Sequence, residues 1–173
     1  MRVAFDGVGL VLVVAALLVF VFQLGRSVQL CATSTPRLRI GSVTVADAPV
    51  ASPRTLWLGR HWVLLPPGMS RPDRDLAVRH ELTHIRHRDT AWAWATALLC
   101  AFCAPNPFAW LFARNLAELD EHAVDHELVH RRRVSPRAYG SLLLSAAQGG
   151  PTVLQAAAGL SPRTSLHRRL VML

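Results

Sequence analysis

The chain has 173 residues, of which 51% are hydrophobic, and its formal net charge is +8 at pH 7. This length suits one domain of ordinary size plus a membrane segment. All 19 basic residues are arginines, and the sequence contains no recognisable nucleic-acid-binding module. We therefore expect attraction to anionic membrane lipid and no nucleic-acid partner. Three cysteines, an odd count, argue against a small secreted disulfide scaffold.

The first apolar stretch, residues 7–24, contains no charge. It is long enough to cross the hydrocarbon core of a membrane as a helix. A signal peptide is the alternative, but only Arg2 precedes the stretch and Asp6 adjoins it. We therefore expect a retained transmembrane helix over residues 1–25. Because the arginines lie mainly after it, the positive-inside rule places the rest of the chain on the cytoplasmic side of the cell membrane.

Residues 26–53 contain scattered Ser, Thr, Pro and Gly among weakly alternating apolar positions, and we expect a linker that passes into strands. Residues 55–58 and 61–65 predict a β-hairpin that turns at Gly59-Arg60. The strand 61–65 can hold an extended substrate by backbone pairing. Packing of its apolar side chains in the core is an equally good interpretation.

The most informative motif is the H-E-x-x-H sequence at residues 80–84. His80 and His84 are four residues apart, so on a helix, expected from about residue 73 to 89, both imidazoles can reach one metal ion. Glu81 stands where a carboxylate can take the proton of a metal-bound water. Two histidines on a helix can also belong to an ordinary surface face.

Catalytic zinc usually keeps three protein ligands and one open position, and the acidic, helix-favouring segment 115–125 offers the third ligand. Glu121 and Asp125 share a helix face, so Glu121 can bind the metal while Asp125 accepts the free ring N–H of a ligand histidine. Glu118 is the rival ligand, but His122, one turn further on, supplies no carboxylate. A solvated acidic face is the alternative interpretation.

Three further residues near these motifs, His87, Cys100 and Cys103, can bind metal in principle. His87 lies one turn beyond His84 and is treated as a bystander. The role of Asp89 stays open, because the C-terminal end of a helix gives no electrostatic reason for an acid. Cys100 and Cys103 lie inside an apolar run without a second pair, which favours small buried hydrophobes over a redox or metal site.

Residues 91–104 are apolar and would form a helix about 21 Å long, shorter than the roughly 30 Å of the hydrocarbon core. Prolines flank Asn106 directly after this segment. If it crossed the membrane alone, Glu121 would lie on the opposite side from the two histidines, which a shared metal forbids. We therefore expect an apolar helical hairpin over residues 91–119 that dips into the membrane. A core helix is the alternative.

Taken in order, these motifs resemble the BlaR/MecR-type membrane zinc metallopeptidases over roughly residues 50–173. HtpX-like membrane proteases share the H-E-x-x-H and E-x-x-x-D elements and are the nearest competitor. Val124 stands where the family often has a cysteine that is not a ligand. The resemblance rests on residues 58–66, 80–89, 106–107, 121–125, 135–139 and 168–173.

The residues and the resemblance together imply a mainly α-helical fold with a small β-hairpin or sheet and a zincin-like peptidase core in residues 54–173. We expect a membrane-anchored endopeptidase with Zn2+ as cofactor that cleaves a protein substrate, with a membrane sensor or regulator as a candidate partner. Tyr139 and Arg169 are candidate donors to the reaction's oxyanion, and a structural role is their alternative. A non-catalytic zinc-binding regulator is the second hypothesis; Glu81 argues against it, because a structural site needs no base.

Overall fold

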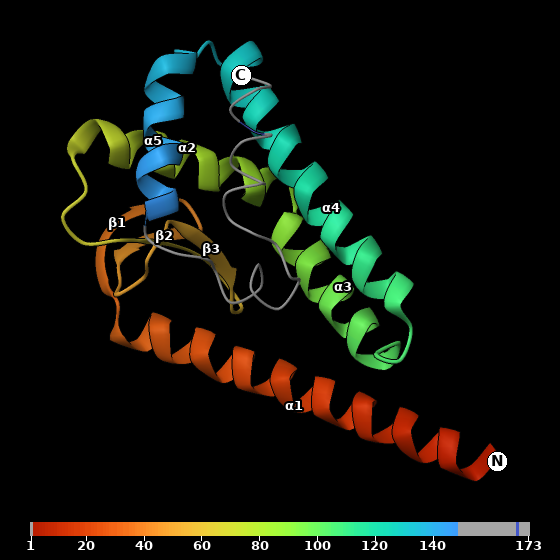
Figure 1. The fold of residues 1–173 in the computed structure, drawn as a ribbon. Coiled ribbons are helices and arrows are strands. Elements are labelled where there is room, and N and C mark those ends of the chain that lie inside the picture. The colour runs from red at the N-terminus through yellow and green to blue at the C-terminus, as the bar shows by residue number, and fades with distance from the viewer. Residues whose placement is uncertain (1, 149–168, 170–173) are drawn as a thin grey trace.

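The computed structural model of the protein describes residues 2–148 and residue 169 (Figure 1). Over this part of the chain the fold is mainly helical with one small mixed sheet, as expected. A π-helical turn (Glu127–Arg131) continues directly from an α-helix (Pro107–His126). The elements are α1 (Arg2–Thr33), β1 (Thr35–Ile40), β2 (Val43–Asp47), β3 (Arg54–Trp57), β4 (His61–Leu65), α2 (Arg71–His87), α3 (Asp89–Phe102), α4 (Pro107–His126), η1 (Glu127–Arg131) and α5 (Pro136–Gln148).

Of the linker passing into strands expected over residues 26–53, the strands are present, but a helix occupies the first part of this range. Helix α1 continues to Thr33, and the next residues form the antiparallel hairpin β1–β2. Gly41 turns this hairpin with a φ of 58°, a conformation that favours glycine. The polar residues that suggested a linker instead alternate with apolar ones along two short strands. The second hairpin, β3–β4, turns at Gly59 as predicted.

The strand order is β1-β2-β4-β3, with β2 and β4 parallel and the other two pairs antiparallel. Strand β4, residues 61–65, is therefore paired on both sides and cannot add a substrate strand. Of our two interpretations of this strand, substrate pairing is wrong, and core packing is confirmed by the complete burial of Val63, Leu64 and Leu65. The edge strands of the sheet are β1 and β3.

The two faces of the sheet pack against different helices. On one face, Val63 and Leu65 join a core formed with α2, α4, η1 and α5. On the other face, Leu64 packs in a smaller cluster that includes Leu30 from the last turns of α1. Because side chains alternate along a strand, one short sheet separates the two cores. Figure 1 shows the sheet between α2 and the end of α1.

Helix α2 begins and ends with clear local signals. The Ser70 hydroxyl group accepts a hydrogen bond from the backbone N–H of Asp73, and Pro72 occupies the first turn. The helix ends at His87 because Arg88 is left-handed, with a φ of 63°. Asp89 is then the first residue of α3, where an acid is favoured by the helix dipole. Placing Asp89 in the last turn of the preceding helix was wrong.

Helices α3 and α4 form the expected helical hairpin. Asn106 caps α4 by accepting a hydrogen bond from the backbone N–H of Phe108, which turns the chain between the two helices. Helix α1 packs along α3 through an edge-to-face contact of Phe20 with Trp94, whose ring centroids are 5.2 Å apart. Cys100 is buried, in agreement with the expected role as a small hydrophobe.

Helix α1 carries the one segment, among the described residues, that is long and apolar enough to cross a membrane. This segment is Gly9–Thr33, and length and composition alone identify it, as they would a signal sequence near an N-terminus. At its beginning, Gly9 lies close to the hairpin turn, because a Cβ atom on Gly9 would be 3.9 Å from Cγ of Pro105. The hairpin therefore extends along most of this segment.

Candidate metal centre

Helices α2 and α4 bring together the three residues that the sequence proposed as metal ligands. His80 and His84 lie one turn apart on α2, and Glu121 faces them from α4. One ligand atom from each lies within 4.8 Å of the others. The two Nε2 atoms are 3.1 Å apart, and the Glu121 oxygens lie 3.7 Å from His80 Nε2 and 3.8 Å from His84 Nε2.

The atoms in this group fit a metal ion. Both histidine rings use Nδ1 for an outer partner, so that their Nε2 atoms point toward the same place. Oε2 of Glu121 is buried and accepts no hydrogen bond of suitable geometry, although the charge of Arg169 lies 2.9 Å away. Two imidazole nitrogens and one carboxylate oxygen are the donor set of many catalytic zinc sites. Glu118, the rival ligand, lies outside the group and forms an ion pair of 3.6 Å with Arg114.

The ring of His84 is held by Asp89. Its Nδ1–H donates a hydrogen bond of 2.7 Å to Asp89 Oδ2. Burial lowers the pKa of His84, but this hydrogen bond and the charge of Glu121 outweigh burial and raise the pKa to about 9. Asp89 thus performs the task that we had assigned to Asp125. The corrected boundary between α2 and α3 explains why the sequence left its role open.

The ring of His80 is held through an intermediate tyrosine. Its Nδ1–H donates to the Tyr139 hydroxyl group at 2.7 Å, and this hydroxyl group donates to Asp125 Oδ1 at 2.6 Å. Asp125 therefore reaches the ligand histidine through Tyr139, not directly as expected. Tyr139 is completely buried, and its one hydroxyl proton is already donated. The structural role that was its alternative thus describes it better than donation to an oxyanion.

Arg169 connects the two acids of α4. It donates two hydrogen bonds of 2.7 Å to Asp125, one to each carboxylate oxygen, and its Nη1 lies 2.9 Å from Oε2 of Glu121. Burial raises the pKa of Glu121, but the charge of Arg169 and the contacts with both histidines lower it far below its usual range. Glu121 is therefore an anion, as a metal ligand must be.

Glu81 lies on α2 beside the first histidine and is 5% exposed. Thr55, on the edge strand β3, donates a hydrogen bond of 2.7 Å to Oε2 of Glu81. Nothing in the sequence near Thr55 indicated this contact, because it joins residues 26 positions apart. A residue of the sheet thus holds the Glu81 carboxylate in place.

A comparison with family models identifies the family of this chain. The family described as BlaR1 peptidase M56 matches residues 7–173. The chain belongs to this family. A comparison with curated proteins found no match. Membership of the M56 family implies a metallopeptidase, and the group of His80, His84 and Glu121 offers it a metal site.

A buried acid, Glu127, lies at the C-terminal end of α2, beyond the candidate metal ligands. His87, treated as a bystander, lies outside the ligand group, and its Nε2 is 2.9 Å from Glu127 Oε2. Arg86 and Arg132 form ion pairs with the other oxygen of Glu127. These contacts connect the last turn of α2 to η1, directly after the helix that carries Glu121. They hold together the two helices that supply the metal ligands.

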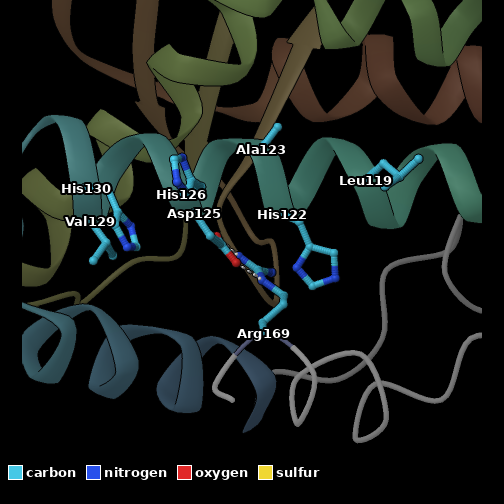
Figure 2. Close-up of a pocket in the computed structure, with 8 residues that line it drawn as sticks. All are labelled: Leu119, His122, Ala123, Asp125, His126, Val129, His130 and Arg169. Carbon is cyan, nitrogen blue, oxygen red and sulfur yellow. Dashed lines mark hydrogen bonds and ion pairs between the residues drawn. The ribbon is translucent and has the colours of Figure 1, made fainter. Parts of the chain in front are cut away.

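A cavity of about 390 Å³ lies beside this centre and is lined in part by Asp125 and Arg169 (Figure 2). Figure 2 shows Asp125 reaching from α4 toward Arg169. The rings of His126 and His130 are stacked, with centroids 4.4 Å apart. These histidines lie outside the metal-binding group found among the described residues. The lining residues are Leu119, His122, Ala123, Asp125, His126, Val129, His130 and Arg169.

Proposed function

We propose that the protein is a membrane-anchored zinc endopeptidase that cleaves a protein substrate in regulatory proteolysis. The observation that carries this proposal is the convergence of His80, His84 and Glu121 around one point, with Glu81 on the same helix as the histidines. In an M56 peptidase, this arrangement supplies both a metal site and a base. A structural metal site would have no use for a fixed carboxylate beside it.

Zinc, when bound by these three residues, supplies the Lewis acidity that polarises a scissile carbonyl group and acidifies a water molecule. Glu81 accepts the proton of the attacking water and transfers it to the leaving amine. The hydrogen bond from Thr55 holds the Glu81 carboxylate in one orientation, which lowers the entropic cost of reaching the reactive geometry. Arg169, which already lies beside Glu121, is the candidate donor to the developing oxyanion.

Strand β3 is the proposed place for the substrate backbone. It is an edge strand, and Thr55 in it contacts Glu81. An extended peptide that pairs with the outer edge of β3 would form a further strand of the sheet. Its scissile bond would then lie near the base and the metal ligands.

We propose that α1 and the α3–α4 hairpin anchor the protein in the membrane, with the metal centre on the cytoplasmic side. The arginines after α1 support this orientation. Bulky apolar side chains on the hairpin are exposed, and an unusually apolar exposed surface marks a lipid or protein contact. These side chains are Trp92, Leu98, Leu99, Phe102, Phe108, Trp110, Leu111, Phe112 and Leu119.

The test compares variants of the full chain in detergent. Glu81→Gln should keep the metal, because the residue is not a ligand, while cleavage of a casein-like substrate falls by at least ~10²-fold. His80→Ala, His84→Ala and Glu121→Ala should each lose zinc, measured by elemental analysis. Glu118→Ala is the matched control and should keep both zinc and activity.

Unchanged cleavage by Glu81→Gln would refute the proposed mechanism. Loss of zinc from Glu118→Ala but not from Glu121→Ala would refute the ligand assignment. Substrates can be sought by comparing the membrane proteomes of cells that carry wild-type protein or Glu81→Gln. A substrate should accumulate uncleaved only in cells that carry the variant.

A further inference from the structure

A second cluster of charged side chains lies on the face of the sheet away from the metal centre. Arg54, in β3, is partly buried, and its Nε atom is buried without a hydrogen-bond partner. Leu56 is two residues further along the same strand and therefore points to the same side. Leu56 packs in the small core with Leu30 of α1. Arg54 thus lies where the sheet meets the end of α1.

Arg26 approaches the same place from α1. It is one turn before Leu30, so the two side chains share a helix face. Burial lowers the pKa of Arg54, the charge of Glu81 raises it, and the charge of Arg26 lowers it again. The two guanidinium groups are therefore close enough to repel each other. Among the described residues, no carboxylate forms an ion pair with Arg54.

A third guanidinium group completes the cluster. Arg60 lies over the ring of Trp62, 4.9 Å from the centroid, and Trp62 packs against the same small core as Leu30 and Leu56. Arg54 and Arg60 therefore lie on the face of the sheet that packs against the end of α1, Arg54 beside Leu56 and Arg60 beside Trp62. The charge of Glu81 offsets part of the cost of burying Arg54, but no hydrogen bond satisfies its Nε atom and the charge of Arg26 repels it.

The position of Arg26 along α1 indicates which kind of anion can bind to this cluster of arginines. Arg26 is 17 residues after Gly9, the first residue of the apolar segment. At 1.5 Å per residue this is about 26 Å, close to the roughly 30 Å thickness of the hydrocarbon core. Arg26 is therefore at the depth of the lipid headgroups when the segment spans a membrane. Tryptophan is enriched at the same depth.

We propose that Arg26, Arg54 and Arg60 bind the phosphate group of an anionic phospholipid. Guanidinium groups donate paired hydrogen bonds to phosphate oxygens, and a phosphate here would satisfy Arg54 and relieve its repulsion with Arg26. The lipid chains would lie along the apolar surface of α1. This inference rests on the proposed membrane location of α1, but not on peptidase activity.

The test measures lipid retention by the full chain after reconstitution into bilayers of equal parts phosphatidylglycerol and phosphatidylcholine. Mass spectrometry of the extracted protein should show wild-type protein enriched in phosphatidylglycerol. Arg26→Gln/Arg54→Gln should reduce this enrichment on the order of tenfold, as expected for lost hydrogen bonds to a charged group. Arg39→Gln/Arg71→Gln is the matched control, because it removes the same charge from two exposed arginines.

Equal enrichment in the two double variants would overturn the site, and so would equal retention of both lipids by wild-type protein. Inorganic phosphate alone, tested by thermal unfolding in detergent, should not stabilise the protein. If inorganic phosphate stabilised the protein as much as phosphatidylglycerol does, the ligand of the site would be free phosphate and the proposed lipid binding would be overturned. Carbonate washing separates the two proposals: wild-type protein that stays in the membrane without lipid preference refutes this site alone, whereas released protein refutes the membrane anchor as well.

Discussion

The hydroxyl group of Thr55 lies 2.7 Å from Oε2 of Glu81, so a hydrogen bond joins the edge strand β3 to the residue between His80 and His84, the candidate metal ligands of α2. The same hydroxyl group is 3.3 Å from the backbone oxygen of Glu81. The strand proposed to hold the substrate is thus in direct contact with the proposed base. Substrate pairing and proton transfer are expected to depend on each other.

Replacing Thr55 tests this dependence. Thr55→Val keeps the shape of the side chain but removes the hydroxyl group, so Glu81 should lose its fixed orientation. Turnover should fall by roughly 10–100-fold, the range for one hydrogen bond to a charged group, while zinc content stays unchanged. Thr55→Ser should restore most of the turnover. Equal steady-state rates for Thr55→Val and wild-type protein would contradict the assignment.

The outer partners of the two histidines should control metal affinity. Tyr139→Phe removes the hydroxyl group that accepts from His80, and Asp89→Asn removes the charged acceptor of His84. Each change should weaken zinc affinity by roughly 10–100-fold, measured by competition with a chromophoric chelator. Phe can fill the buried space of Tyr139, and the bond between Asp125 and Arg169 is not removed. A normal affinity in both variants would show that the rings are positioned without these partners.

Metal binding should release a proton from His84. The raised pKa of about 9 means that this ring is protonated at pH 7.5 in the metal-free protein, whereas a metal binds the neutral ring. The release should therefore be present at neutral pH and disappear as the pH rises above 9. Calorimetric titrations at pH 7.5 in two buffers with different ionisation enthalpies measure it. Asp89→Asn, which removes the main cause of the raised pKa, should release less, and identical heats in both buffers for wild-type protein would contradict this prediction.

The depth of the hairpin in the membrane can be probed at its turn. Phe20 contacts Trp94, and Gly9 lies beside Pro105, so the turn of the hairpin lies beside the beginning of the apolar segment. In a background without Cys31, Cys100 and Cys103, Asn106→Cys should resist a membrane-impermeant thiol reagent added from outside. Arg2→Cys should react and is the positive control. Labelling of Asn106→Cys as fast as the control would mean that the hairpin crosses the membrane completely.

Local patterns in the sequence were sufficient to predict the ligand group. His80 and His84 are one turn apart on any helix, and the acids of α4 follow the same spacing, so only one pairing of the two helices was needed to bring them together. The β3–β4 hairpin was equally predictable, since Gly59 adopts the positive φ that its turn requires. These features depend on residues close together in the chain.

The features that could not be predicted depend on contacts between distant residues. The sequence did not decide between an accessible and a core position for strand β4, because its parallel pairing with β2 leaves no pattern in either strand. The end of α2 was misplaced because Arg88, not a glycine, adopts the left-handed conformation. Tyr139 comes between His80 and Asp125 only because α5 packs against the same core as α2.

Arg88 also separates the helix that carries His84 from the hairpin that is proposed to contact the membrane. Before it lies the helix with His84, and after it Asp89 begins the hairpin proposed to lie in lipid. Since Asp89 both starts the hairpin and holds the ring of His84, any tilting of the hairpin moves that imidazole. Bilayer thickness and lateral pressure, which set the tilt of apolar helices, would in this way act mechanically on the reactivity of the enzyme.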